Sequence, residues 1–309
     1  MPSNRPLSRS IIKIALRVVL GSSRAHVQDW FPGLRLDCPA GFEGGFMRYR
    51  GVVVGRLTTS RQAFRQRISR VLIVGSGPSI TRTDLGRAEE FSCVLLNGAL
   101  HLVPEVVSKP LAVAIEDERF VWGNFDLLAR IPAECPCLFS VSVIRAICQL
   151  DRTWLQDRKI VLIDDVRKPY GRSRRDITEL RRLSHANLSE DGATGFSKDP
   201  DAGVFQGGSV AVSAMQFAAS WKPKEIGLLG IDISNADEPR FYEERNKAYS
   251  GIRRAQNRIL DHLIMAKNAA VENGITVRNY SPVSALAEHG FGYSSEFANS
   301  TDPAPPKAP

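Results

Sequence analysis

The run IVGSGPS, from Ile73 to Ser79, carries the residue types and spacing best suited to chemistry in this chain. Gly75 and Gly77 have no Cβ, so the backbone there can adopt positive φ and approach a ligand closely. Pro78 suits a first helical turn, where backbone amides without helical partners form an anion site. The spacing therefore predicts a phosphate site made by Gly75, Ser76, Gly77, Pro78 and Ser79.

A plain strand-to-helix turn is the alternative interpretation of this run, because a GxG pair alone is a weak signal. The third glycine of the dinucleotide-binding fingerprint is also missing, since Ile80 occupies its place. The sequence thus disfavours a standard NAD site and leaves a phosphate or nucleotide site open.

Short apolar runs alternate with helical patterns from Arg70 onward, which is typical of a doubly wound, mostly parallel α/β sheet of the Rossmann-like kind. We expect strands at 71–74, 93–97, 111–117, 137–143, 159–165, 225–233 and 275–281, and helices at 83–90, 119–131, 207–221 and 252–273. Ligands of such sheets bind beyond the carboxyl ends of the strands. The polar residues expected at those ends include Asn97, Glu116, Asp117, Asp164, Asp165 and Asp232.

The pattern divides the chain into three parts: a basic N-terminal extension of residues 1–69, a Rossmann-like domain of residues 70–290 and a tail of residues 291–309 that we expect to be disordered. Residues 166–206 interrupt the regular pattern with a polar, basic and Gly-rich stretch. Irregular segments of this length are uncommon inside compact domains unless they have a function. We expect this segment to cover the substrate as a lid.

Charge is distributed unevenly along the sequence. The chain has 41 Lys and Arg against 33 Asp and Glu, a net charge of +8, and the excess gathers before residue 70 and at 167–182, which favours contact with an anionic surface or substrate. The segment Ile11–Leu20 is apolar but interrupted by Lys13 and Arg17. It predicts either a helix at an anionic membrane surface or a helix that packs one face on the main domain.

Other classes of function find less support in the composition. No apolar run approaches the length that spans a bilayer, and the basic residues form no recognised nucleic-acid motif and are not interleaved with aromatic ones. The five cysteines have neither metal-ligand spacing nor a disulfide pattern, which indicates a reducing compartment. We therefore expect a cytoplasmic protein, at the inner face of the cytoplasmic membrane if the N-terminal segment binds lipid, with self-association left open.

Three stretches carry a resemblance to a known family: IVGSGPS, LLNGAL at the second strand, and GGSVAVSAMQFAASWKPKEIGLLGIDIS near the end. They resemble the bacterial sialyltransferases that use CMP-activated sugars, within a wider Rossmann-like set that includes pterin diphosphokinases. The resemblance covers roughly residues 70–286. It implies nucleotide contacts from the Gly75 to Ser79 loop and from Asn97, Gly208, Ser209 and Ser281.

The chain departs from that family at the residues expected to act chemically. Ser234 stands where the family has a tyrosine, while Tyr242, or alternatively Tyr249, matches a second one. Asn257 stands where the family has its histidine, and an asparagine cannot act as a general base. The base is then expected at Asp232 or His185, with Glu116 and Asp117 as further alternatives.

The resemblance implies an inverting glycosyltransferase that moves a sialic-acid-like or Kdo-like sugar from a CMP donor to a surface glycan or lipid-linked acceptor. The implied catalytic residues are Asp232, His185, Tyr242 and Tyr249. The CMP-sugar is a substrate, and no further cofactor is required. The resembled family does not depend on a metal, and a metal at the strand-end carboxyl groups of this chain is left unassigned. Two alternatives stay open: a pterin-type diphosphokinase that uses ATP and magnesium, and a nucleotide-binding protein without catalysis.

Overall fold

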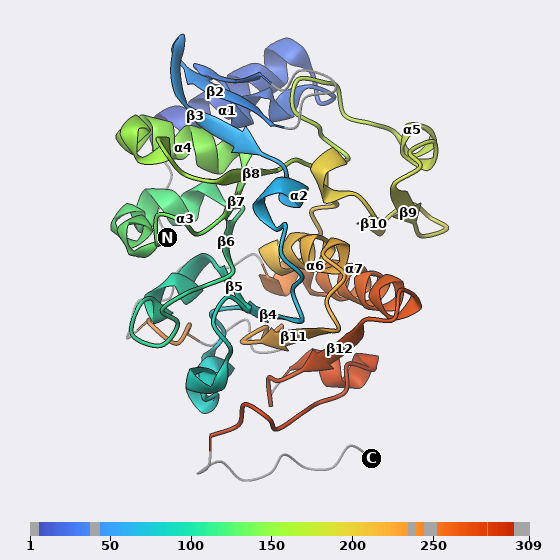
Figure 1. The fold of residues 1–309 in the computed structure, drawn as a ribbon. Coiled ribbons are helices and arrows are strands. Elements are labelled where there is room, and N and C mark those ends of the chain that lie inside the picture. Colours follow the sequence, from blue (N-terminus) through green and yellow to red (C-terminus); the bar gives the residue numbers. More distant parts are fainter. Residues whose placement is uncertain (1–5, 38–43, 234–238, 244–251, 283, 300–309) are drawn as a thin grey trace. The chain divides into compact units, whose positions relative to one another are not determined.

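The computed structural model describes residues 6–37, 44–233, 239–243, 252–282 and 284–299. The chain forms two compact units, each assembled from two stretches of sequence (Figure 1). Unit 1 comprises Met1–Gln66 and Ala112–Gln206, and unit 2 comprises Arg67–Leu111 and Gly207–Pro309. Both units combine helices with mostly parallel strands, so the predicted α/β class is confirmed.

Unit 2 contains four parallel strands in the order β5-β4-β11-β12. Their bounds are Arg70–Val74 for β4, Cys93–Leu96 for β5, Glu225–Leu229 for β11 and Thr276–Asn279 for β12. The four apolar residues Val71 to Val74 are fully buried, as the unbroken apolar run predicts. The chain leaves β4 toward β5 on one side, whereas β11 lies on the other side of β4. The carboxyl ends of β4 and β11 thus form a topological switch point, where ligands of such sheets bind.

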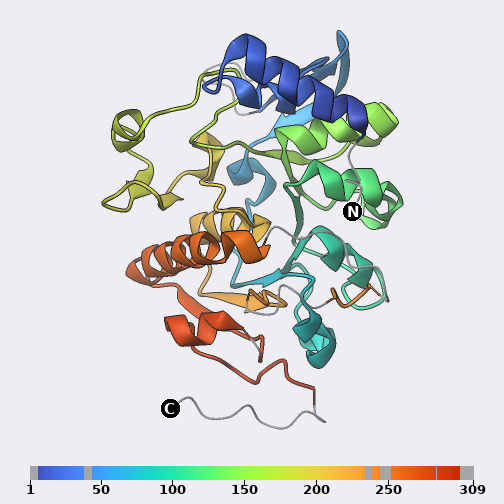
Figure 2. The same ribbon diagram turned by 180° about the vertical axis from the view of Figure 1, so that it is seen from behind.

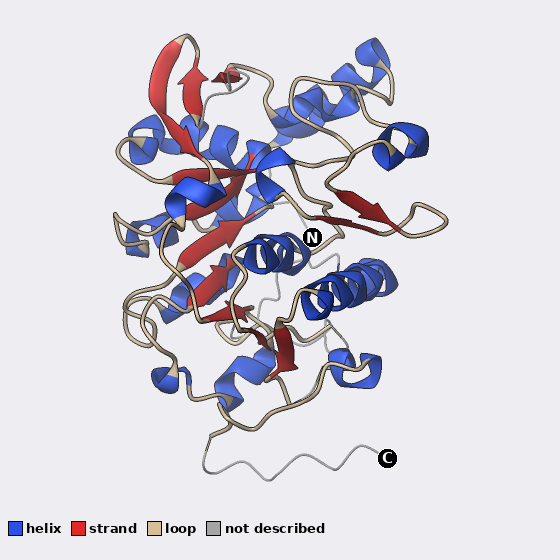
Figure 3. Ribbon diagram, turned by 45° about the vertical axis from the view of Figure 1, so that its right-hand side comes forward, coloured by secondary structure: helices blue, strands red, loops and turns tan. Residues whose placement is uncertain are grey.

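Two helices, α6 (Val210–Ser220) and α7 (Ile252–Glu272), lie side by side on this sheet (Figure 3). The Ser209 side chain accepts a hydrogen bond from the Ala211 amide and so caps α6. Small residues such as Ala211, Ser213 and Ala214 are buried along α6, which allows close packing. Both helices confirm the sequence predictions.

The helix predicted at 83–90 is absent from unit 2. The chain there forms two short 3₁₀ turns, η2 (Pro78–Arg82) and η3 (Leu85–Arg87), separated by extended residues. A similar 3₁₀ turn, η4 (Asn97–Leu102), follows β5, and η8 (Ala285–His289) follows β12. The loop after β4 therefore has no α-helix N-terminus, which corrects the expectation of a helical anion site at this point.

Part of the predicted disordered tail is ordered in unit 2. Phe291 and Phe297 are buried, and the Phe297 ring lies edge-on to Tyr280 with their centroids 4.9 Å apart. The Asp84 amide donates to the Phe297 carbonyl at 2.8 Å. These contacts fix residues 291–299 on the unit, because they bury two aromatic rings. Residues 300–309 lie outside the described part of the chain.

Unit 1 contains six strands in the order β1-β2-β3-β8-β7-β6. Their bounds are Leu34–Asp37 for β1, Gly45–Tyr49 for β2, Val52–Thr58 for β3, Ala112–Ile115 for β6, Cys137–Ser140 for β7 and Ile160–Ile163 for β8. The strands β1, β2 and β3 are antiparallel, and the others run parallel to β3. The N-terminal extension thus supplies an antiparallel edge to a parallel sheet.

The helices of unit 1 are short. They are α2 (Ser60–Ala63), α3 (Glu118–Gly123), α4 (Val141–Asp151) and α5 (Ile177–Arg181), with 3₁₀ turns η1 (Ala25–Asp29), η5 (Phe125–Arg130), η6 (Arg152–Leu155) and η7 (Pro200–Ala202). The helix predicted at 119–131 breaks at Asn124. Residues 166–206 include α5 and a hairpin of β9 (Ala186–Leu188) and β10 (Gly195–Ser197), around a small core of Val166, Leu180 and Phe205.

The N-terminal helix α1 (Leu7–Leu20) lies alongside α4 in unit 1 (Figure 2). Its contact face includes the fully buried Arg9, which donates to the Phe31 and Gln28 carbonyls and lies near the Glu118 carboxylate. Arg145 of α4 donates to the same carboxylate. The opposite face exposes Leu7, Ile11, Ile14 and Val18. No helix in the described part of the chain is long and apolar enough to cross a membrane.

Candidate functional sites

The Gly75 to Ser79 loop follows β4 and is hydrogen-bonded to the end of β11. The Gly75 amide donates to the Leu229 carbonyl at 2.8 Å, and the Gly77 amide donates to the Gly230 carbonyl at 3.0 Å. The Ser79 amide donates to the Asp232 carboxylate at 2.7 Å. These three amides are therefore occupied within unit 2, which corrects the expectation that they face a phosphate.

The loop glycines have a packing reason instead. A Cβ at Gly75 would lie 2.4 Å from the Gly230 carbonyl oxygen, and one at Gly77 would lie 2.5 Å from the Asp232 carboxylate. Real Cβ atoms do not approach other atoms so closely. The loops after β4 and β11 can therefore come into contact only because these two residues lack a Cβ. The close approach that glycine allows is made here by a neighbouring backbone segment and not by a ligand.

Asp232 anchors the loop, because both of its carboxylate oxygens accept hydrogen bonds from Ser79. One oxygen accepts from the Ser79 amide, and the other accepts from the Ser79 hydroxyl at 2.6 Å. The Asp232 side chain is buried. A carboxylate held in this way is a poor candidate for a proton acceptor, since its lone pairs already serve the fold.

The partly exposed groups near the loop form a cluster around Tyr242, which we call the Tyr242 cluster: Ser76, His101, Arg240, Phe241 and Tyr242. The Arg240 guanidinium donates to the Tyr242 hydroxyl at 2.9 Å. The His101 ring stacks on the Tyr242 ring with centroids 4.2 Å apart and an 18° interplanar angle. The Phe241 amide donates to the Ser76 carbonyl at 3.4 Å, which joins the cluster to the loop.

Burial and charge act in opposite directions on the Tyr242 hydroxyl. Burial raises the pKa of Tyr242, while the Arg240 charge and hydrogen bonds from Arg240 and Ser76 partly offset this rise. The hydroxyl therefore stays protonated at neutral pH and can donate a hydrogen bond. Gly98 makes room for it, because a Cβ there would lie 2.2 Å from the Tyr242 ring. The Glu243 carboxylate lies 3.8 Å from the Arg240 guanidinium and raises the pKa of Tyr242 further. The guanidinium and the neutral hydroxyls of the cluster are donors of the kind that bind a phosphate, with Glu243 as a competing anion.

Two predicted nucleotide contacts, Asn97 and Ser281, carry buried polar atoms that have no hydrogen-bond partner among the described residues: Asn97 Oδ1 and Ser281 Oγ. Asn97 follows β5 with a φ of +44°, and Ser281 follows β12. An unpaired buried acceptor costs free energy, so a water or ligand group at Asn97 would be stabilising. Ser281 is fully buried, and its amide donates to the Asn279 side chain.

The turn before α6 packs under α7. The Arg258 side chain donates to the Gly207 carbonyl at 3.0 Å, and Gly208 has a φ of +99° with Arg258 against it. The Ser209 hydroxyl is used as the helix cap. Asn257 lies exposed on α7, and the buried His262 shares a hydrogen bond with the Arg258 carbonyl at 2.7 Å.

The remaining predicted catalytic residues are not members of the Tyr242 cluster. His185 belongs to unit 1, where burial lowers its pKa while Asp199 raises it. Tyr249 and Ser234 lie outside the described residues.

Sequence reasoning missed His101 and Arg240. His101 follows the second-strand asparagine by four positions, so the strand-end rule that found Asn97 also contained the signal for His101.

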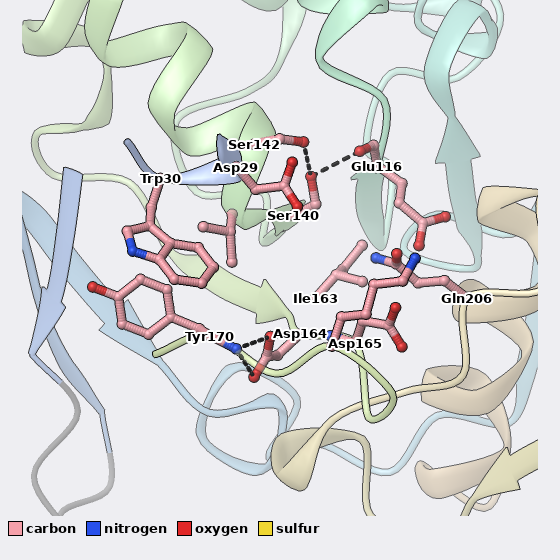
Figure 4. Close-up of a pocket in the computed structure, with 12 residues that line it drawn as sticks. Asp29, Trp30, Glu116, Ser140, Ser142, Ile163, Asp164, Asp165, Tyr170 and Gln206 are labelled. Atoms are coloured by element: carbon pink, nitrogen blue, oxygen red, sulfur yellow. Dashed lines mark hydrogen bonds between the residues drawn. The ribbon is translucent and has the colours of Figure 1, made fainter. Parts of the chain in front are cut away.

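A second candidate site lies wholly within unit 1, in a cavity of about 160 Å³ (Figure 4). Glu116, Ser140 and Asp164 line it at the carboxyl ends of β6, β7 and β8. Burial raises the pKa of Asp164 to about 7, against the Tyr170 amide, which lowers it. Burial also raises the pKa of Asp165. Three of the predicted strand-end carboxyl groups, Glu116, Asp164 and Asp165, thus line one cavity, whereas Asp117 is paired with Arg119 and Asp232 belongs to unit 2.

No family model and no curated protein matches the sequence. Among solved structures, the sialyltransferase CstII from Campylobacter jejuni, in complex with the substrate analogue CMP-3FNeuAc, is 13% identical with a TM-score of 0.40, over 75% of this chain and 89% of that chain. The monofunctional α-2,3-sialyltransferase Cst-I from the same organism is 12% identical with a TM-score of 0.39, over 77% and 87%. This likeness is distant and assigns no donor, acceptor or catalytic residue.

Proposed function

We propose that the chain is an inverting glycosyltransferase that takes a sialic-acid-like or Kdo-like sugar from a CMP donor. The observation that carries the proposal is the Tyr242 hydroxyl, held by Arg240 beside the Gly75 to Ser79 loop at the switch point of the unit 2 sheet. Tyr242, which the family resemblance matched, is hydrogen-bonded there to Arg240, which the sequence analysis did not single out. The acceptor is a surface glycan or lipid-linked oligosaccharide.

The Tyr242 cluster serves the departing phosphate. In the reaction, the bond between the anomeric carbon and the phosphate oxygen breaks, and the acceptor oxygen bonds to that carbon from the opposite face. Negative charge develops on the CMP phosphate as it leaves. Preorganised donors at the point where charge develops lower the barrier, and Arg240, Tyr242 and Ser76 are donors of this kind.

The base in this proposal is His101. The acceptor hydroxyl loses its proton as it attacks, and a neutral imidazole is the side chain best suited to take that proton near pH 7. His101 stacks directly on Tyr242, whereas both Asp232 oxygens accept from Ser79. His101 thus replaces Asp232 as the proposed general base. It supplies the imidazole that the resembled family has at the position occupied here by Asn257.

The N-terminal helix would bring the enzyme to a lipid-linked acceptor. The apolar stripe of Leu7, Ile11, Ile14 and Val18 faces outward, and Lys13 and Arg17 flank one side of it. A helix with an exposed aliphatic stripe beside cations suits the surface of an anionic bilayer. The packing interpretation describes the Arg9 face of α1, which contacts unit 1, and the membrane interpretation is proposed for its outer face.

A thermal-shift panel of CMP, CDP, UDP, ADP and ATP, with and without magnesium, tests the donor class. A ligand that binds only the native state at 100 times its Kd stabilises it by about 2.7 kcal/mol. We expect the largest rise in Tm with CMP and CDP, independent of magnesium. Arg240→Ala should remove the rise, and the control Arg87→Ala, a cation paired with Asp84 elsewhere in unit 2, should keep it.

Two outcomes would count against the proposal. A rise with ATP and magnesium but none with CMP would favour the diphosphokinase alternative. A rise with CMP without release of CMP from CMP-sialic acid or CMP-Kdo, in the presence of acceptor, would favour a nucleotide-binding protein without catalysis.

A further inference from the structure

The cavity of unit 1 is too small for a nucleotide sugar. Its volume of about 160 Å³ is well below the ~300–1,000 Å³ of pockets that take drug-sized ligands. Every lining residue belongs to unit 1, so the cavity is a property of that unit alone. It has room for one ring.

One wall of the cavity is aromatic and fixed in place. The Trp30 and Tyr170 rings lie 4.8 Å apart at 60° (Figure 4). The Tyr170 hydroxyl accepts from the Leu36 amide at 2.9 Å, and the Tyr170 amide donates to the Asp164 carboxylate at 3.0 Å. A rigid aromatic wall offers an apolar face to a flat ligand at little entropic cost.

The other walls are rich in hydrogen-bond acceptors. Asp29, Glu116, Asp164 and Asp165 contribute carboxyl groups. The Ser140 hydroxyl donates to the Glu116 carbonyl at 2.7 Å and lies 3.1 Å from the Ser142 hydroxyl. Lys168 is the cation on the lining. The lining is therefore predominantly acidic, which disfavours phosphates and carboxylate sugars and favours ligands that donate hydrogen bonds.

These carboxyl groups do not form a metal cage. Within the described residues, no group of three or more His, Cys, Asp or Glu side chains is placed to hold a metal ion. The Asp164 oxygens accept from the Asp165 and Tyr170 amides, and Asp165 accepts from the Arg167 amide, so both carboxyl groups are oriented by the backbone. An oriented carboxyl group is well suited to bind a particular ligand hydroxyl.

We propose that this cavity binds one uncharged sugar ring, with a face of the ring against Trp30 and its hydroxyls on the carboxyl groups and serines. A pyranose combines the two features that the lining demands, an apolar C–H face and an edge of hydroxyl donors. The site would hold a neutral sugar of a glycan, and it does not depend on what unit 2 binds.

Ligand-detected saturation-transfer NMR on the full chain tests this site directly. The probes are the methyl α-glycosides of glucose, galactose and mannose, with methyl α-glucuronide and glucose 6-phosphate as anionic counterparts. We expect at least one neutral glycoside to bind weakly, with a Kd on the order of 1 mM, and both anions to give no signal. Binding of the anions alone, or of none of the probes, would overturn the proposal.

Variants then assign the binding to the cavity. Trp30→Ala should weaken sugar binding at least tenfold, and Trp30→Phe should retain most of the affinity. Ser142→Gln leaves Trp30 and Tyr170 unaltered and should block binding, because the larger side chain fills the cavity. Phe46→Ala, which removes an exposed aromatic ring of the same unit outside the cavity, is the matched control. Binding that survives both Trp30→Ala and Ser142→Gln in folded protein would place the sugar elsewhere. CMP is absent from these samples, so failure here leaves the proposed donor site untouched.

Discussion

At the scale of single residues, the proposed transfer depends on an imidazole that the sequence did not single out. His101→Gln keeps a polar side chain of similar reach but cannot accept a proton at neutral pH. We expect kcat to fall about a hundredfold or more, with CMP affinity within a factor of a few. The control is His289→Gln, on the exposed turn η8 of the same unit. An unchanged kcat would remove His101 from the reaction.

Asp164 should make the stability of the protein depend on pH. Burial raises its pKa to about 7 in the folded state, whereas an unfolded aspartate titrates near pH 4. The folded state binds more protons between these values, so the free energy of unfolding falls as pH rises from about 4 to about 7. Asp164→Asn removes the titration and should flatten this fall by about 3 kcal/mol, because a shift of about three pKa units corresponds to ~1.4 kcal/mol per unit.

Chemical denaturation at pH 4.5 and 7 measures this effect. Burial also raises the pKa values of Asp165 and Asp201. The Asp164→Asn variant therefore keeps part of the fall in unfolding free energy with pH. Asp191→Asn is the control, because hydrogen bonds from Ser189 and Ala193 lower the pKa of Asp191 instead. If Asp164→Asn and Asp191→Asn show the same slope as the parent protein, Asp164 does not titrate in this range.

At the scale of elements, the contact between the loops after β4 and β11 should matter for folding as well as for binding. Gly77→Ala places a Cβ 2.5 Å from the Asp232 carboxylate and 2.7 Å from the Gly230 carbonyl. We expect a loss of about 1–3 kcal/mol in the free energy of unfolding, the typical cost of overpacking, together with weaker CMP binding. Gly292→Ala, where a Cβ meets nothing within 4 Å, is the matched control in unit 2. Equal stability of the two variants would contradict the assigned loop contact.

The outer face of α1 can be tested without disturbing its inner face. Ile11, Ile14 and Val18 are 66%, 66% and 79% exposed, so replacing all three by Gln should change stability little. We expect association with vesicles that contain anionic lipid to weaken at least tenfold, because the apolar area that enters the interface is lost. Val52→Thr with Val53→Thr, at exposed positions of β3, should bind vesicles like the parent protein. Equal binding by all three forms would restrict α1 to its packing role.

The comparison between sequence and structure is also clearest at the scale of elements. The apolar runs before Gly75 and Asn97 predicted β4 and β5 well, because burial on both faces leaves an unbroken apolar signature. The run from Thr83 to Glu90 did not form a helix, since its residues bond the chain's C-terminal segment, as Asp84 does with Phe297. Such long-range contacts leave no local pattern.

The candidate site was predictable only in part, for the same reason. The GxGPS spacing located the loop, and the family resemblance pointed to Tyr242. The pattern could not reveal that the loop amides bond β11 or that Asp232 is held by Ser79, 153 positions earlier. The strand-end rule reaches His101, but the contacts of His101 and Arg240 with Tyr242 depend on packing between separate loops, which no single-sequence rule gives.

In the whole molecule, the two units are proposed to bind different ligands, a CMP-sugar in unit 2 and an uncharged sugar in unit 1. Unit 2 carries the Tyr242 cluster beside the switch point, and unit 1 carries the acidic, aromatic cavity. A net charge of +8 favours the approach of an anionic donor or membrane over distances of about a Debye length. The acidic lining of the cavity is a local exception to this charge, which is consistent with an uncharged sugar there.

Hydrogen exchange of the full chain with and without CMP tests the central claim most directly, because it reports which backbone amides the nucleotide protects. We expect protection to be greatest in residues 97–101 and 240–243 of unit 2 and to be abolished by Arg240→Ala, whereas the Gly77 and Ser79 amides are already hydrogen-bonded without ligand. Bound CMP that protects neither of these two segments, or that protects them equally in the Arg240→Ala variant, would show that the Tyr242 cluster does not hold the nucleotide phosphate.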